Sequence, residues 1–229
     1  MNSTAGRPSS RLHRWWQRAR RVGAERIAPS RVLVRHGPRD RSRVALTFDD
    51  GPDAMTREYL DVLDRLGVHA TFFVVGEKCA EHGDLLVDMV RRGHELGHHG
   101  FRHLRLPRLS LREIRDELRR TAEVLPPSRT RRPLVRPPTG ESSVRSLLAC
   151  ALLGYRTVLW SCDSDDYRTR DAGEIARRLG PSIVEPGDIL LLHEGQQWTL
   201  DALPQIIARL LEAGFAIGTV GELLEGVPT

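Results

Sequence analysis

Short apolar runs alternate with amphipathic helical segments from residue 43 onward, and this alternation limits the possible folds more than any other feature of the sequence. Strands are predicted at residues 44–48, 70–75, 94–98, 134–136, 155–160, 188–192 and 215–219. Helices are predicted between them, at residues 56–66, 85–92, 110–124, 142–153, 171–179 and 200–213. Ser110, followed three residues later by Glu113, predicts a capping box at the start of the third of these helices. Strands that are apolar throughout and separated by helices are typical of a parallel sheet buried on both faces. About seven such units in one domain favour an α/β barrel over an open sheet.

The first 42 residues are predicted to form a basic arm that precedes a domain at residues 43–229. Residues 1–43 hold twelve arginines and only two acids, Glu25 and Asp40, whereas the net charge of the whole chain is only +5. The high isoelectric point therefore belongs to the arm. A basic arm without a recognised motif does not predict nucleic-acid binding.

Residues 11–27 of this arm place Trp15 and Trp16 among arginines, in a segment that suits a short helix. Two interpretations are open: the segment suits the headgroup layer of an anionic membrane, or it is a solvated tail whose tryptophans pack on the domain. No run approaches the roughly 18 apolar residues of a membrane span, and no apolar signal-peptide core follows the basic residues. The three cysteines are scattered and odd in number, which favours a reducing compartment. We therefore expect a cytoplasmic protein, peripheral to the inner face of a membrane if the arm binds lipid.

Ionisable residues lie at, or within a few residues after, the ends of five of the predicted strands. They are Asp49, Asp50, His99, His103, Arg136, Asp163, Asp166 and His193. The carboxyl ends of barrel strands open onto one face, which is where active sites are built. Packing alone does not explain so many ionisable groups converging from separate strands, so we expect them to form a functional site.

His99 and His103 are four residues apart, a spacing that places both imidazoles on one side of a helical turn. With Asp50 they supply two imidazoles and one carboxylate, which leaves an open coordination position for water at a catalytic zinc. The plainer alternatives are a surface helix for the histidines, and a helix cap with a tight turn for the Asp-Asp-Gly-Pro segment. Capping needs only one carboxylate, however, and a second one buried beside it costs free energy without a cation.

Five short motifs occur in order along the chain: TFDDGP (residues 47–52), HHGFRH (98–103), RPPTG (136–140), SCDSDDY (161–167) and ILLLH (189–193). Together they resemble the motifs of the polysaccharide deacetylases, the NodB homology domain of carbohydrate esterase family 4, over about residues 43–222. The resemblance implies a distorted (β/α)7 barrel and one divalent metal ion, often zinc, with cobalt or nickel able to substitute. It also implies hydrolysis of an N-acetyl group, usually from N-acetylglucosamine.

The resemblance assigns roles to the residues that match these motifs. It implies that Asp50, His99 and His103 bind the metal, and that Asp49 is the catalytic base, paired with Arg136. Such a pair fits the chemistry, because a guanidinium beside a carboxylate favours its ionised form.

A general acid is implied at His193, which would protonate the leaving amine while Asp166 orients its ring. Amide hydrolysis needs a polarised carbonyl, an activated water and a protonated leaving nitrogen, so these roles suit the chemistry. Taken alone, His193 is more simply explained as a satisfied core histidine. The main chain near Thr139 would help to hold the oxyanion. The residues expected to contact substrate are Thr139, Gly140, Tyr167 and Leu191.

Four positions depart from the usual family pattern. Gly100 stands where serine or threonine is usual, at a position that helps to set the histidine loop, and no ligand is lost. Thr139 and Tyr167 stand where tyrosine and tryptophan are common, so the site is expected to grip sugar rings differently. His98 replaces a frequent asparagine and adds an imidazole that we place beside the metal ligands. These departures affect the choice of substrate more than catalysis.

Two other functions remain compatible with the sequence. An O-acetyl esterase acting on acetylated polysaccharide would use the same metal site, and an inactive carbohydrate-binding barrel would keep the fold without the chemistry. Barrels of the second kind generally lose the base or a ligand, whereas this sequence retains Asp49 and the three proposed ligands. We therefore predict a hydrolase of non-peptide carbon–nitrogen bonds with a carbohydrate substrate and no nucleic-acid partner.

Overall fold

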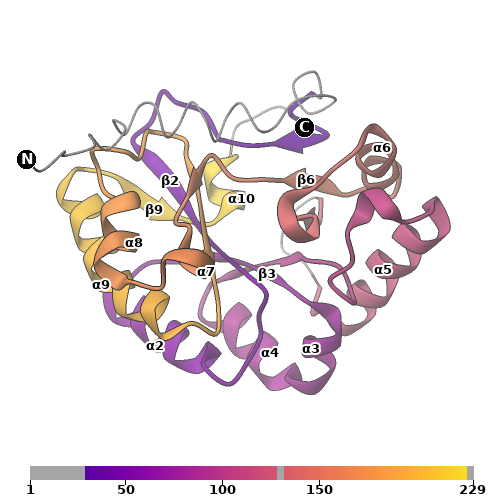
Figure 1. The fold of residues 1–229 in the computed structure, drawn as a ribbon, viewed down its shortest axis with the longest axis horizontal. Helices are drawn as coiled ribbons and strands as arrows, with labels where there is room; N and C mark the ends of the chain where they lie inside the picture. The colour runs from indigo at the N-terminus through magenta and orange to yellow at the C-terminus, as the bar shows by residue number, and fades with distance from the viewer. Residues whose placement is uncertain (1–28, 128–131, 226–229) are drawn as a thin grey trace, which may run out of the picture.

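A curled sheet of parallel strands forms the frame of the computed structural model, which describes residues 29–127 and 132–225 (Figure 1). Within these ranges the strands are β1 (Leu33–Val34), β2 (Arg43–Asp49), β3 (Thr71–Val74), β4 (Glu95–His98), β5 (Leu134–Val135), β6 (Arg156–Val158), β7 (Cys162–Asp163), β8 (Ile189–His193) and β9 (Ala216–Gly218). They pair in the order β1-β6-β5-β4-β3-β2-β8-β7, with β9 on β2. Among the described residues β1 and β7 do not pair with each other, so this is the predicted barrel in an open, distorted form.

Helices cover the outer side of the curled sheet, as Figure 1 shows for α2, α4, α5 and α9. The helices described are α2 (Thr56–Leu66), α3 (Gly76–Glu81), α4 (Gly83–Arg91), α5 (Leu111–Val124), α6 (Val144–Leu152), α7 (Asp166–Thr169), α8 (Ala172–Arg178), α9 (Gln197–Glu212) and α10 (Val220–Leu223). Two 3-10 turns, η2 (Leu106–Arg108) and η3 (Pro138–Gly140), precede α5 and α6. Within the described ranges, none of these helices has the length and apolar character needed to cross a bilayer.

Alternation of side chains along β2 divides the core into two layers. Leu46 and Phe48 pack in a large cluster with residues of α2, α4 and α9. Ala45 belongs instead to a cluster inside the barrel, together with Phe73 and Ile189. Successive strand residues point to opposite faces, so one strand serves both layers. Because apolar side chains fill both layers, polar side chains collect beyond the carboxyl ends of the strands.

Most of the predicted helices and strands are present in the structure at or near the predicted residues. The helix predicted at residues 56–66 is α2 in full, and the predicted capping box of α5 is formed by Ser110 and Glu113. By contrast, β1 pairs with β6 although it lies inside the predicted arm of residues 1–42, so the fold begins before residue 43. A two-residue strand has no periodicity of its own, and the same brevity explains why β7, α7 and α10 were not predicted. The helix predicted within residues 11–27 lies outside the described residues.

The three cysteines form no disulfide with one another and are buried in the core. Cys79 and Cys150 are each only 1% exposed, and Cys162 is 6% exposed. Burial raises the pKa of the Cys79 thiol to about 12 and that of Cys150 to about 11. These side chains therefore pack as small apolar groups rather than as nucleophiles.

Replacing Gly97 of β4 by alanine is expected to destabilise the fold by about 1–3 kcal/mol, because the new methyl group overpacks the barrel. A Cβ at Gly97 would lie 2.5 Å from the ring of fully buried Phe73. Chemical denaturation of both proteins measures the change in free energy of unfolding. The control is Gly83→Ala at the start of α4, where a Cβ meets nothing within 4 Å. Equal stability of the two variants would contradict this account of the barrel interior.

Candidate active site

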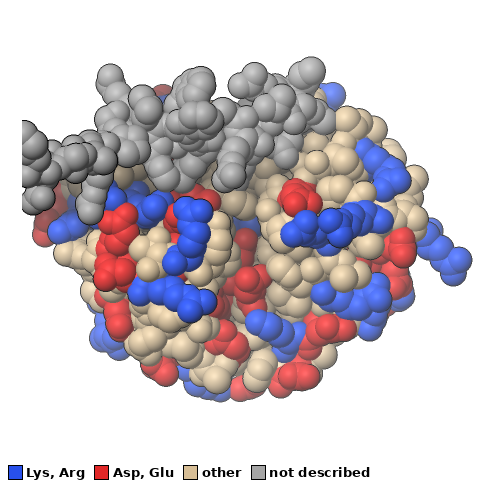
Figure 2. Space-filling view, in the orientation of Figure 1, with Lys and Arg blue, Asp and Glu red and all other residues tan. Residues whose placement is uncertain are grey.

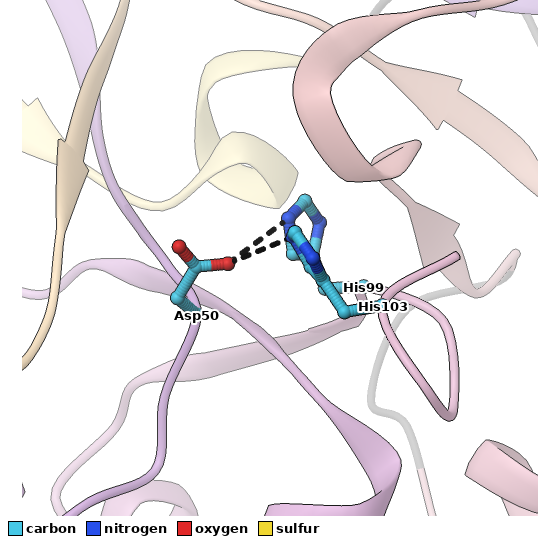
Figure 3. A group of neighbouring side chains, drawn as sticks. All are labelled: Asp50, His99 and His103. Atoms are coloured by element: carbon cyan, nitrogen blue, oxygen red, sulfur yellow. Dashed lines mark ion pairs between the residues drawn. The ribbon is translucent and has the colours of Figure 1, made fainter. Parts of the chain in front are cut away.

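Three candidate metal ligands meet at the carboxyl end of the sheet (Figure 3). Asp50 follows β2, His99 follows β4, and His103 lies further along the same loop. Oδ1 of Asp50 is 3.4 Å from Nε2 of His99 and 3.1 Å from Nε2 of His103. One potential ligand atom from each residue lies within 4.8 Å of the others. A single cation can therefore contact all three side chains.

The hydrogen bonding of His99 shows that this cluster suits a cation. Its Nδ1–H donates to the main-chain oxygen of Arg136 at 2.9 Å, which leaves Nε2 as the ring nitrogen that faces Asp50. A metal-binding imidazole is held in this way, with one ring nitrogen on a carbonyl and the other turned toward the metal. Burial alone would raise the pKa of Asp50, but the imidazoles of His103 and His99 hold it well below its ordinary range. An ionised carboxylate and two imidazoles are ligands suited to a divalent metal.

The loop that carries the two histidines is not the helical turn predicted from their spacing. Gly100 and His103 have φ angles of +78° and +55°, in the left-handed region that a right-handed helix excludes. The chain folds back instead, and the two rings lie 5.0 Å apart. Asp50 is also left-handed, with φ of +73°. Such backbone costs about 1–3 kcal/mol per non-glycine residue, so surrounding contacts must hold the ligands in place.

One of these contacts is made by Glu117 of α5, whose side chain is fully buried. Its Oε2 accepts hydrogen bonds from the main-chain N–H groups of Phe101 and Arg102, both at 2.9 Å. Its Oε1 accepts from Nε of Arg102 at 2.8 Å. Glu117 therefore holds the loop between the two histidines. The presence of Gly100 in this loop does not disturb these hydrogen bonds. The sequence analysis missed this residue, although a glutamate on the buried face of an amphipathic helix is a usable signal.

A buried ion pair holds the predicted base. Nη1 of Arg136 donates to Oδ1 of Asp49 at 2.7 Å and to Oγ1 of Thr47 at 2.9 Å. Arg136 is completely buried; its burial lowers the pKa of the guanidinium, and Asp49 opposes that effect. The second oxygen of Asp49, Oδ2, lies 3.7 Å from Nε2 of His99. One carboxylate oxygen is therefore fixed by arginine while the other faces the metal ligands.

The predicted general acid is held in the same way on the neighbouring strand β8. Nδ1–H of His193 donates to Oδ1 of Asp166 at 2.7 Å, and the main-chain N–H of His193 donates to Oδ2 at 2.8 Å. Thr199 of α9 donates to Oδ2 as well, at 2.9 Å. Burial by itself would lower the pKa of His193, but the hydrogen bond and charge of Asp166 raise it to about 9. His193 is therefore protonated at neutral pH, and Nε2 carries the proton that faces away from Asp166.

The residues expected to contact substrate lie around these groups. Thr139 and Gly140 have φ angles of +63° and +69° in η3, and a Cβ on Gly140 would lie 2.4 Å from the Trp160 ring. Tyr167 is 51% exposed and packs edge-on against His193, with ring centroids 5.6 Å apart. Leu191 is buried in β8, on the same side of the strand as His193. Contact of these residues with a sugar stays a prediction.

Two other polar residues do not join the cluster in the expected way. The ring of His98 packs against Tyr155 with centroids 4.8 Å apart, and burial lowers the pKa of His98 to about 4. Adjacent strand residues face opposite sides, so His98 lies on the outer side of β4, and its expected place beside the ligands was wrong. Asp163 accepts hydrogen bonds from Nε1 of Trp160 and from the main chain of Asp165, at 3.1 and 2.9 Å. It supports the turn before α7.

A second buried carboxylate that the sequence analysis missed lies under the Asp-Asp-Gly-Pro turn. Oε1 of Glu194 accepts a hydrogen bond from Thr56 at 2.6 Å, and its main-chain N–H donates to the carbonyl of Asp49. A Cβ added at Gly51 would lie only 1.6 Å from Oε2 of Glu194. Burial raises the pKa of Glu194 to about 8. Gly51 is therefore required because this side chain fills the space beside it.

A family model described as polysaccharide deacetylase matches residues 36–158 of the chain. Over 186 residues, 34% are identical to the peptidoglycan-N-acetylmuramic acid deacetylase PdaC of Bacillus subtilis, a match covering 80% of this chain and 38% of that protein. Over 204 residues, 30% are identical to a peptidoglycan-N-acetylglucosamine deacetylase of Bacillus cereus, covering 86% of this chain and 95% of that protein. The chain thus spans about two fifths of the length of PdaC but nearly all of the second relative.

A solved structure has the same fold. The crystal structure of the Bc1960 peptidoglycan N-acetylglucosamine deacetylase superposes with a TM-score of 0.80 at 30% sequence identity. The match covers 85% of this chain and 93% of the other. The similarity therefore extends over most of this chain.

Replacing Glu117 by alanine is expected to weaken binding of a divalent metal about tenfold or more, because the loop between His99 and His103 loses its anchor. Titration calorimetry of metal-free protein with zinc measures the affinity. The control is Glu123→Ala, which removes an exposed carboxylate from the same helix. Unchanged affinity in the Glu117 variant, with a folded protein by circular dichroism, would contradict the positioning role.

Replacing Asp166 by asparagine is expected to lower the pKa of His193 from about 9 to about 6.5 or below, because burial then acts without the compensating charge. In the native protein this pair contributes stability that is complete below about pH 6.5 and is lost as the pH rises through about 9. An NMR titration of the His193 ring measures the pKa directly. Asp163→Asn is the control, and a pKa near 9 in the Asp166 variant would refute the assignment.

Proposed function

The chain belongs to the polysaccharide deacetylase family, and on that premise we propose that it is a metal-dependent hydrolase that removes N-acetyl groups from the amino sugars of a glycan, releasing acetate. One observation carries the proposal: the donor atoms of Asp50, His99 and His103 converge beside the oxygen of Asp49 that Arg136 leaves available. The protonated ring of His193 lies close enough for the charges of Asp49 and Asp50 to raise its pKa further. A base, an acid and a metal site thus surround the position that the acetyl group of the substrate would occupy.

Asp50, His99 and His103 would hold the metal, which would polarise the acetyl carbonyl and make a bound water more acidic. The base is Oδ2 of Asp49, because Arg136 occupies Oδ1 and fixes the plane of the carboxylate. This oxygen removes a proton from the attacking water. The main chain at Thr139, fixed in its left-handed conformation, supports the developing oxyanion from the side of η3.

Breaking the carbon–nitrogen bond requires a proton on the leaving amine, and His193 supplies it. Because Asp166 accepts from Nδ1, the transferable proton is on Nε2. The raised pKa of about 9 keeps this proton in place at neutral pH until nitrogen becomes basic enough to take it. Asp49 therefore acts as the base and His193 as the acid. Arg136 holds the base in place, and Asp166 holds the acid.

The substrate and the metal follow from the chemistry of the site and from the relatives. The printed names of the relatives refer to N-acetylglucosamine and N-acetylmuramic acid in peptidoglycan, which supports an N-acetylated amino sugar of the N-acetylglucosamine type here. Zinc is the proposed ion, because two imidazoles and one carboxylate suit it, with cobalt or nickel as substitutes. The exposed ring of Tyr167 is proposed to border the sugar.

A cytoplasmic position at the inner face of an anionic membrane is also proposed, with contact through residues 11–27. The support is the arginine- and tryptophan-rich composition of that segment, which lies outside the described residues.

Acetate release from N-acetylglucosamine oligomers is expected to require a divalent metal and to fall at least about 100-fold in Asp49→Asn. Asparagine preserves the shape of the side chain but cannot accept the proton. Activity is measured on metal-free protein before and after addition of zinc or cobalt. Calorimetry should show that the Asp49 variant still binds metal, because Asp49 is not among the three ligands.

Asp61→Asn, on the exposed side of α2, is the matched control and should retain activity. Acetate released only from an O-acetylated xylan oligosaccharide would favour the esterase alternative. Metal binding without release from either substrate would favour a carbohydrate-binding barrel. Failure to bind metal at all would overturn the proposal.

A further inference from the structure

Helix α6 presents an apolar stripe to solvent. Val144, Leu148 and Leu152 recur at intervals of four residues and are 55%, 53% and 87% exposed. Leu153, which follows the helix, is 38% exposed. The opposite face of α6 is buried, with Leu147 at 4%. Side chains four residues apart lie one above the other on a helix, so these leucines and the valine form a continuous ridge rather than scattered exposed residues.

The charge of the chain is strongly divided, and α6 lies in a positive part. Residues 124–162 contain six arginines and one acid, Glu141, although two of the arginines, Arg136 and Arg156, are buried. Residues 1–43 carry a net charge of +10, whereas residues 44–123 and 163–229 together carry −10. On the right of the face in Figure 2, basic side chains lie over α5 and α6, with acidic side chains among them.

The two positive parts of the chain meet beside α6. β1, which follows the arm, pairs with β6, and Leu33 packs in one cluster with Leu147 of α6. Arg132 donates to the main-chain oxygen of Arg31 at 3.4 Å. Arg145 of α6 is exposed and donates to two main-chain oxygens of the segment before α5. The first described residues, which lead into β1, therefore lie on the side of the molecule where the apolar ridge lies.

Charge decides among the occupants that could cover this ridge. The arm is itself strongly basic, so it does not complement a helix whose exposed charged residue is Arg145. A second copy would bring the same positive charge, and a few side chains on a nine-residue helix fall far short of the roughly 800 Å² per partner of a stable interface. An anionic lipid surface complements both the ridge and the arm, because leucines enter the acyl boundary while arginines meet the headgroups. We propose that α6 is the membrane-docking surface of this protein and that its partner is an anionic lipid bilayer.

Docking through α6 would also orient the active site. α6 begins shortly after η3, and Pro138 of η3 lies against the loop of the metal ligands, 3.5 Å from a Cβ placed on Gly100. The helix is only about 13 Å long, so the mouth of the site would stand close to the bilayer. Provided that the proposed function holds, the natural substrate is an amino sugar carried on a membrane lipid.

The test measures partition of the full-length protein onto vesicles of phosphatidylcholine containing about a third of phosphatidylglycerol. The variant Leu148→Gln/Leu152→Gln removes the apolar ridge without changing charge, and glutamine is as good a helix former as leucine. Partition should fall about tenfold or more. The matched control is Val87→Gln/Leu211→Gln, which makes the same change at exposed positions of α4 and α9.

A large loss of partition in the α6 variant, none in the control, and weak binding to pure phosphatidylcholine are the expected results. Equal partition of the wild type and the α6 variant would overturn the proposal, since the arm would then suffice. A wild-type dimer that the α6 substitutions dissociate, without any effect on vesicles, would assign the ridge to self-association and also overturn it. Acetate release from a soluble oligosaccharide, measured on the same proteins, tests the proposed function separately, because neither leucine touches the site.

Discussion

Arg136 is the residue on which the arrangement of the site depends. Its guanidinium fixes one oxygen of Asp49, and its carbonyl accepts the Nδ1–H of His99. Its main-chain N–H donates to the carbonyl of His98, so the same residue also joins β4 to the chain after β5. The side chain of Arg136 therefore orients the base Asp49, and the main-chain carbonyl of Arg136 orients the metal ligand His99. A buried ion pair of this kind contributes little net stability, because desolvation offsets most of the attraction, but loss of either partner leaves an uncompensated charge in the core.

The two loops that carry the ligands depend on buried carboxylates that do no chemistry. Glu117 holds the histidine loop and Glu194 underlies the turn after β2. Both loops contain a ligand with left-handed backbone, Asp50 in one and His103 in the other. The rigid sheet brings each loop to the right place, and the buried acids then hold conformations that would otherwise relax. Hydrogen bonding from loop N–H groups compensates Glu117 for burial, as a main-chain N–H does for Asp166 under His193, whereas Glu194 accepts its hydrogen bond from the hydroxyl of Thr56.

The sequence predicted the parts of this protein whose signals are local. The periodicity of α2, the capping box of α5 and the apolar runs of the central strands all lie within a few consecutive residues. The order of the strand ends was enough to bring Asp49, Asp50, His99 and His193 to one face. Spacing alone was misleading for His99 and His103, because a loop with two left-handed residues can also bring side chains four apart together. The buried position of Glu117 could be read from the pattern of α5, but its partners lie in a separate loop whose fold that pattern does not contain.

The burial of the three cysteines bears on the environments in which this fold can exist. A thiol with a pKa near 11 or 12 is almost never a thiolate at neutral pH, and the thiolate is the form that oxidants and disulfides attack. The side chains of Cys79, Cys150 and Cys162 are also shielded from reagents by the core. The fold should consequently behave alike on either side of a cell membrane, since no exposed sulfur responds to the local redox potential. The odd number of cysteines, which first suggested a reducing compartment, is thus no constraint on where such a barrel could work.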